Sequence, residues 1–199
     1  MSANKAVRLL GVPLSQPFTS CAWAMLQLEV PFKIEITVPG ASGKMGTKHD
    51  SFKSLTSHRS TQVPVLVDDD FALTESPAIM TYLCEKYGGR HGEDPKLYAP
   101  PGSEKKAMID SYMHWHHTHT RSVSKLFGSK VRPDLKVNVS EEDEEAIQDI
   151  LASIDSGWLH SSSYIGGSET PSIADILAYG EVRYWLHLRI LARCSAILV

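Results

Sequence analysis

Residues 63–79 read VPVLVDDDFALTESPAI, and this stretch decides the fold of the chain. Two apolar runs lie on either side of Asp68-Asp69-Asp70, which is the pattern of two antiparallel strands joined by a tight turn. Glu75-Ser76-Pro77 then begins a helix, with Ser76 as the N-cap and Pro77 at the first helical position. The first turn of a helix carries unpaired N–H groups, so if any part of this chain binds a small anionic ligand, we expect it to be this stretch.

The segment before this stretch predicts two further strands joined by a helix. Residues 7–12 are a short apolar run suited to a buried strand, and Ser15-Gln16-Pro17 begins a helix that ends near residue 28. Residues 32–38 alternate apolar with polar side chains, which predicts a strand with its apolar side buried. A helix between the first two strands makes them parallel. With a short helix at 48–55, the N-terminal half predicts a mixed four-stranded sheet in the thioredoxin-like α/β arrangement.

The second half of the chain predicts only helices. Residues 89–102 are rich in glycine and proline and form the predicted linker. Residues 103–127 predict one long helix, and Ser140 and Ser172 each precede another helix, with an aspartate three positions later. We therefore predict a thioredoxin-like domain at 1–88, a linker at 89–102 and an all-α domain at 103–199.

The composition is that of an ordinary globular protein. The chain has 199 residues and a net charge of -3, from 20 basic and 23 acidic side chains. This balance, without a basic cluster, argues against a nucleic-acid partner, and no apolar run is long enough to span a membrane. Three widely spaced cysteines, Cys21, Cys84 and Cys194, suit reduced thiols in a cytoplasmic protein.

Several motifs in the same order resemble those of cytosolic glutathione transferases. Val63-Pro64 before a strand, Glu75-Ser76 at a helix start and Ser172-Ile173-Ala174-Asp175 in the helical domain are similar to motifs of this family. Leu14-Ser15-Gln16-Pro17 resembles the serine motif of the theta class, and residues 114–121 are also similar to theta-type sequences. The resemblance covers roughly residues 7–185 and implies glutathione as co-substrate, a small electrophile as second substrate and a homodimer.

The resemblance implies that the opening stretch holds the glutathione backbone. Ser76, at a helix N-terminus, suits the γ-glutamyl carboxylate, and Glu75 suits the ammonium group. Pro64 corresponds to a cis-proline of the family, which turns the backbone groups of Val63 outward so that a peptide can pair with them. Without the family context, Ser76 is a plain N-cap and Pro64 a trans-proline at the start of a strand.

Ser15 is the expected catalytic residue. The nucleophile is the glutathione thiol, which is reactive as the thiolate, and a hydroxyl that donates a hydrogen bond to sulfur favours that form. The N-terminus of the helix after Ser15 adds positive potential. The simpler alternative is a helix cap. Thr19, Ser20 and Cys21 are nearby alternatives, and Cys21 is better explained as a packed thiol.

The remaining site residues are less sharply defined. His49 and Gln62 are the two candidates to meet the glycine carboxylate of glutathione. The resemblance also implies that Asp110 could reach a neighbouring subunit's glutathione and that Arg121 could lie near the sulfur or brace its helix. Four histidines in residues 114–119 have spacings that could suit a metal, but they point around the helix, so we expect no metal.

The expected function is conjugation of glutathione to small electrophiles, as in detoxification. Family members usually continue with further helices after the one that begins at Ser172, so we expect the helical domain to be shortened at its C-terminal end. The pocket for the electrophile depends on that region. Two alternatives therefore stay open: a non-catalytic module for protein assembly, and a glutathione-dependent isomerase or dehalogenase.

Overall fold

The computed structural model describes residues 6–58, 60–89, 97–131 and 136–197. It divides into two compact units, Met1–Pro100 and Pro101–Val199. Most of the predicted linker, residues 90–96, lies outside the described residues, so the domain boundaries at 88 and 103 stay a prediction.

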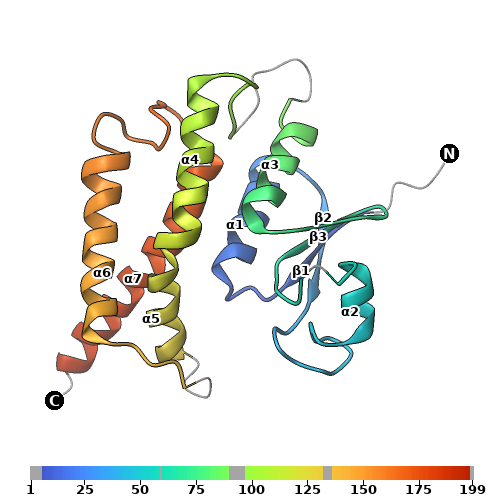
Figure 1. The fold of residues 1–199 in the computed structure, drawn as a ribbon, viewed down its shortest axis with the longest axis horizontal. Coiled ribbons are helices and arrows are strands. Elements are labelled where there is room, and N and C mark those ends of the chain that lie inside the picture. The colour runs from blue at the N-terminus through green and yellow to red at the C-terminus, as the bar shows by residue number, and fades with distance from the viewer. Residues whose placement is uncertain (1–5, 59, 90–96, 132–135, 198–199) are drawn as a thin grey trace. The chain divides into compact units, whose positions relative to one another are not determined.

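A mixed four-stranded sheet forms the centre of the N-terminal unit, in the order β2-β1-β3-β4 (Figure 1). The strands are β1 (Val7–Gly11), β2 (Phe32–Ile36), β3 (Val65–Asp68) and β4 (Phe71–Thr74). β1 pairs with β2 in parallel, and β3 pairs antiparallel with both β1 and β4. The predicted α/β class, the strand directions and the tight Asp-rich turn are confirmed.

The strand register brings four chain segments to one end of the sheet. Leu10, near the end of β1, pairs with Val65 at the start of β3, and Val65 pairs with Thr74 at the end of β4. Gly11 at the end of β1 pairs with Ile36 at the end of β2. The segments after β1, after β2 and after β4, and the segment before β3, therefore all lie at this same end of the sheet.

Helices cover both faces of the sheet. On one face, α1 (Gln16–Gln27) and α3 (Ser76–Tyr87) contact each other. On the other face, α2 (Asp50–Leu55) places Phe52 against Leu10 and Val65 of the sheet core. Strand residues alternate between these two faces, and so both sides of β1 and β3 are buried.

The predicted burial of the second strand is wrong. β2 ends at Ile36 rather than at Val38, and its apolar side faces solvent: Ile34 is 50% exposed and Ile36 is 47% exposed. The physical reason is position, because β2 is the edge strand and its apolar side chains lie beyond the covered centre of the sheet.

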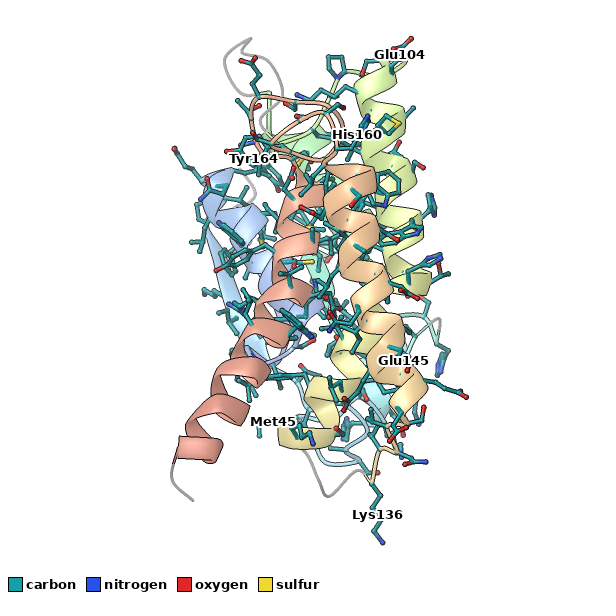
Figure 2. The ribbon with its side chains drawn as sticks, turned by 90° about the vertical axis from the view of Figure 1, so that its left-hand side faces the viewer. Met45, Glu104, Lys136, Glu145, His160 and Tyr164 are labelled. Carbon is teal, nitrogen blue, oxygen red and sulfur yellow. The ribbon has the colours of Figure 1, made fainter. Side chains whose placement is uncertain are left out.

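The C-terminal unit is helical, as predicted, and Figures 1 and 2 show its helices running side by side. Helix α7 contacts α4 and α5, and α5 contacts α6. Val123, Ile147 and Tyr184 form a buried cluster in this unit. The elements are α4 (Glu104–His119), α5 (Arg121–Val131), α6 (Glu141–Ser153), a π-helix at Ile154–Trp158 and α7 (Ile173–Ile197).

The single long helix predicted over residues 103–127 is wrong, because the structure has two helices there. Thr120 is the C-cap of α4, and its hydroxyl donates a hydrogen bond of 2.8 Å to the carbonyl of His116. A threonine hydroxyl that bonds the i−4 carbonyl competes with the helical ladder and bends the chain. The apolar pattern continues through this break, which is why periodicity alone missed it.

Both predicted pairs of a capping serine and an aspartate three residues later form hydrogen bonds in the helical unit, and the pair at α6 is a full capping box. Ser140 and Asp143 bond each other's backbone N–H groups at the start of α6. At the start of α7, Ser172 accepts from the N–H of Ala174 at 3.2 Å and donates its own N–H to Asp175 at 2.7 Å. Figure 2 shows Glu145 pointing away from α6, which fits a solvated acidic face. No described helix is long and apolar enough to cross a membrane.

Candidate functional site

Ser15 is the N-cap of α1, as its sequence context predicts. Its backbone is extended, with φ -79° and ψ 123°, and its carbonyl accepts the N–H of Thr19 at 2.9 Å. The side chain, however, makes no capping hydrogen bond. The hydroxyl is half-buried at a positive helix end and is not committed to the helix it precedes.

The segment around Ser15 is held by its neighbours. The Thr19 hydroxyl donates to the carbonyl of Pro13 at 2.9 Å and to that of Ser15 at 3.0 Å. The buried Gln16 amide donates to the Ser20 hydroxyl at 3.1 Å. Thr19 and Ser20 therefore have structural partners, which weakens both as alternatives to Ser15.

Cys21 is a packed residue rather than a reactive one. Its side chain is fully buried, and burial raises the pKa of its thiol far above the usual range. Its thiol donates to the backbone carbonyl of Ser76 over 3.8 Å. This contact ties α1 to the first residue of α3. Sequence reasoning missed it, because the two residues are 55 positions apart.

The Val63–Pro64 peptide bond is cis, as the motif predicted. Pro64 is buried and Val63 is half-buried. Both lie immediately before β3, at the end of the sheet where β1 ends. The described backbone thus brings this pair to the same end of the sheet as the segment that holds Ser15.

Glu75 and Ser76 follow β4 at that same end of the sheet. Their predicted roles need one correction. Glu75, not Ser76, is the N-cap of α3, and Ser76 is the first helical residue. Glu75 is exposed, makes no side-chain capping bond and has a φ of 69°. A non-glycine residue in this left-handed region is strained, and such strain is concentrated at functional sites. Ser76 is buried.

His49 and Gln62 sit in the segments that flank α2. His49 is the N-cap of α2, and its Nδ1 accepts the N–H of Ser51 at 3.3 Å. Gln62 is exposed, and its backbone N–H donates to the Ser60 hydroxyl at 3.0 Å. Neither arrangement favours one of these two residues over the other as the partner of the glycine carboxylate, so both stay candidates.

The candidates in the helical unit have mixed outcomes. Asp110 accepts a bond of 2.7 Å from Lys106, one turn earlier in α4. The side chain of Arg121 lies outside the described part of the chain. Of the neighbouring histidines, His116 is buried and the rest are exposed. Among the described residues, no group of three or more His, Cys, Asp or Glu could hold a metal ion.

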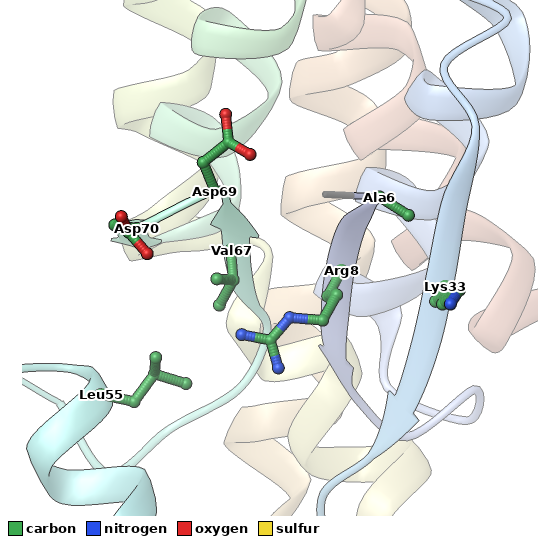
Figure 3. Close-up of a pocket in the computed structure, with 7 residues that line it drawn as sticks. All are labelled: Ala6, Arg8, Lys33, Leu55, Val67, Asp69 and Asp70. Carbon is green, nitrogen blue, oxygen red and sulfur yellow. The ribbon is translucent and has the colours of Figure 1, made fainter. Parts of the chain in front are cut away.

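Two hollows open on the α2 side of the sheet. One of about 580 Å³ is lined by Arg8, Lys33, Asp69 and Asp70 among others (Figure 3). The other, of about 410 Å³, includes Arg8 and Lys44. Neither contains any of the predicted site residues. We place the candidate site by strand register and helix N-termini instead, because these features carry the donors that an anionic peptide requires.

The described residues form a thioredoxin-like domain, in which the candidate site residues lie at one end of the sheet, and a separate helical unit. Residues 9–91 match the family model of the glutathione S-transferase N-terminal domain. Residues 9–91 are therefore similar to that domain, and theta-class glutathione S-transferases are among the relatives of the chain. The resemblance inferred from the motifs is confirmed.

Two curated relatives illustrate the similarity. Glutathione S-transferase theta-1 of Gallus gallus is 32% identical over 131 residues, 61% of this chain and 47% of that relative. Dichloromethane dehalogenase of Methylorubrum extorquens is 27% identical over 188 residues, 89% of this chain and 62% of that relative. The chain thus spans about half to two thirds of the length of these relatives.

A solved structure supports the fold. The crystal structure of human glutathione transferase theta-2, in complex with glutathione and an unknown ligand, superposes with a TM-score of 0.75. The alignment covers 89% of this chain and 71% of that one, at 22% identity. At this identity the likeness concerns the fold.

Proposed function

We propose that this protein is a glutathione transferase that conjugates glutathione to small electrophiles, as in detoxification. In this reaction the glutathione thiol loses its proton to solvent, its sulfur forms a bond to the electrophilic carbon, and the leaving group departs with its electron pair. We further propose that the protein works as a cytoplasmic homodimer, with Asp110 near the glutathione of the neighbouring subunit.

The observation that carries the proposal is that the candidate residues lie at one end of the sheet. The pairing of Leu10 with Val65 and of Val65 with Thr74 supports a site built from Ser15, Val63-Pro64 and Glu75-Ser76. These residues offer what a tripeptide with two carboxylates, one ammonium and one thiol requires. A second, independent support is the match of residues 9–91 to the family model.

Each group of glutathione has a candidate partner. The first-turn N–H groups of α3 suit the γ-glutamyl carboxylate, and the exposed Glu75 carboxylate suits the ammonium group. The backbone of Val63 suits the peptide groups of the ligand. His49 uses Nδ1 in its cap, so Nε2 is the nitrogen that would meet the glycine carboxylate, with Gln62 as the other candidate.

Ser15 acts on the sulfur. Its hydroxyl is not used in capping, so it can donate to the thiolate, and the α1 N-terminus adds positive potential at the same place. A hydrogen bond to a charged group contributes about 1.5–3 kcal/mol, which corresponds to roughly 10- to 100-fold in the ratio of thiolate to thiol.

A second candidate function is dehalogenation, which the similarity to dichloromethane dehalogenase favours. The chemistry is the same attack, with a carbon–chlorine bond breaking and chloride as the leaving group. The two functions differ only in the electrophile that the helical unit accepts.

Binding to immobilised glutathione, followed by turnover of an aryl halide and of dichloromethane, tests the proposal. We expect binding and conjugation, with Ser15→Ala retaining most of the binding but losing turnover. Chloride released from dichloromethane, in excess over aryl conjugation, would favour the dehalogenase. A chain that binds neither glutathione nor electrophile would leave the non-catalytic assembly module as the better account.

A further inference from the structure

Strand β2 presents an open edge with exposed apolar side chains. In the part of the chain that the structure describes, β2 is the terminal strand and no strand of its sheet pairs with its outer side. Ile34 and Ile36 are 50% and 47% exposed. Exposed edges of this kind are templates for pairing with another chain unless charges or bulges block them.

The backbone groups on this edge can be assigned by alternation. The N–H of Thr37 donates to the carbonyl of Gly11 at 3.0 Å, so its backbone faces β1. Successive residues of a strand turn their backbone groups to opposite sides. The backbone N–H and carbonyl groups of Lys33 and Glu35 therefore also face β1, whereas those of Ile34 point outward.

The next residue of the chain supports this assignment. Val38 donates its N–H to the carbonyl of Met45 at 2.7 Å and accepts the N–H of Thr47 at 3.2 Å. Those bonds lie on the outer side of the chain, away from β1. The loop thus closes the edge at Val38, while Ile34 and Ile36 before it stay open in the described structure.

We infer that this edge pairs with the same edge of a second copy of the chain, as antiparallel β2 strands centred on Ile34. In this register Ile34 faces Ile34 of the second copy in a hydrogen-bonded pair, which its outward backbone allows. Phe32 then faces Ile36, so three apolar pairs form on one face. Lys33 faces Glu35 of the second copy, and Glu35 faces Lys33.

Charge complementarity selects this occupant and this register. Lys33 is exposed, and it lies on the α2 side of the sheet (Figure 3). Glu35 already accepts a bond of 2.8 Å from Arg8 through Oε1, and a carboxylate can accept from a second donor through its other oxygen. Lys33 and Glu35 pairs are non-hydrogen-bonded pairs, whose side chains lie closest. A register centred on Ile36 would set Glu35 opposite Thr37 and lose both ion pairs.

This pairing is independent of the proposed enzymatic function and of any dimer made through Asp110. It uses only the edge of the N-terminal sheet. A two-fold contact of this kind closes on itself, so each chain uses it once, and a chain that also dimerises near Asp110 would associate beyond a dimer.

Disulfide trapping tests the register directly. In hydrogen-bonded antiparallel pairs the Cα atoms lie about 5.5 Å apart, within the range that a disulfide spans. We expect Ile34→Cys to form a covalent dimer under mild oxidation and to release it with dithiothreitol. The matched control is Leu26→Cys, a comparably exposed apolar residue on α1 that is not on the edge. Both variants carry Cys194→Ser to remove a competing thiol.

Sedimentation of charge variants tests the complementarity. Lys33→Glu replaces two attractive pairs with two repulsive ones, so we expect association to weaken by about tenfold or more. Lys130→Glu makes the same charge change on α5 and should leave association unchanged. Equal crosslinking of the two cysteine variants, or a Lys33→Glu chain that associates like the parent, would overturn the inference.

A further variant separates this inference from the enzymatic proposal. Ser15→Ala should sediment as the parent does, because the Ser15 hydroxyl is no part of the β2 edge. Loss of conjugation with intact association would concern only the function. Intact conjugation in a chain that sediments as a monomer would refute the edge pairing and the proposed homodimer, and would leave the conjugation activity standing.

Discussion

The carboxylate of Asp68 accepts a hydrogen bond of 2.6 Å from the ammonium group of Lys86. The same oxygen accepts bonds of 2.8 Å from the hydroxyls of Tyr82 and Tyr87. Asp68 is buried at the end of β3, and its three partners lie on α3, so this cluster ties the strand to the far end of that helix. The helix whose N-terminus belongs to the candidate site is thereby held at its other end.

Replacing Asp68 by asparagine should destabilise the N-terminal unit by about 1–2 kcal/mol, because the bond from a charged donor is lost while Lys86, half exposed, returns to water. Urea unfolding measures the change. Asp69→Asn is the control, because Asp69 is exposed and asparagine tolerates its φ of 55°. An equal loss in both variants would show that the cluster contributes nothing of its own.

The stability of the protein should fall in acid through the same carboxylate. Burial opposes ionisation of Asp68, but the bonds from Lys86 and the two tyrosines outweigh it, and the pKa of Asp68 is lowered. A carboxyl whose folded pKa is lower contributes stability above its unfolded pKa of about 3.9, and loses it as pH falls through the folded pKa. Asp68→Asn should therefore flatten the decline of unfolding free energy below about pH 4. An unchanged slope in this variant would contradict the assignment.

Local sequence patterns predicted the parts of the fold that depend on neighbouring residues. The hairpin around Asp68-Asp69-Asp70 and the capping box of Ser140 with Asp143 follow from short-range turn and cap chemistry. The exposed apolar side of β2 and the break between α4 and α5 at Thr120 could not be predicted from such short-range patterns. The first depends on which strand lies at the sheet edge, and the second on a single side-chain bond within an unbroken apolar pattern.

The candidate site was predictable in its motifs but not in its geometry. Ser15 and Val63-Pro64 were recognisable from the order of motifs along the chain. The left-handed backbone of Glu75 carries no signal in its residue type, since glutamate rarely adopts it. The contact between Cys21 and Ser76 joins residues far apart in sequence, so only the packing of α1 against α3 reveals it.

Ser15→Ala and Ser140→Ala should have opposite effects, although both remove a serine at a helix N-cap. Ser15 makes no capping bond, so its loss should leave the unfolding free energy nearly unchanged and lower kcat by about 10- to 100-fold. Ser140 accepts the N–H of Asp143, so its loss should cost about 1 kcal/mol and spare kcat. Thermal unfolding and conjugation rates measure both. A Ser15→Ala chain that loses stability with full turnover would make that serine a plain cap.

Glu75→Ala and Glu75→Gly separate the carboxylate of Glu75 from its backbone strain. Both variants remove the partner proposed for the ammonium group, so both should weaken glutathione binding by a similar factor, on the order of tenfold. Alanine keeps the strain of the left-handed φ of 69° and glycine relieves it, so Glu75→Gly should be more stable by about 1 kcal/mol. Isothermal titration and urea unfolding give the two quantities. Parent-like affinity in both variants would remove Glu75 from the site.

The thiols of Cys21 and Cys84 should resist alkylation in the folded protein. Burial raises the pKa of Cys84 to about 12 and raises that of Cys21 further, so almost no thiolate exists at neutral pH. In a Cys194→Ser chain, iodoacetamide should therefore modify both residues only after unfolding, and Cys21→Ala should keep the glutathione chemistry that depends on Ser15. Mass spectrometry of native and urea-treated samples gives the extent of modification. Rapid native labelling of Cys21, protected by glutathione, would instead place this thiol in the site, because only an accessible thiolate beside the ligand reacts in that way.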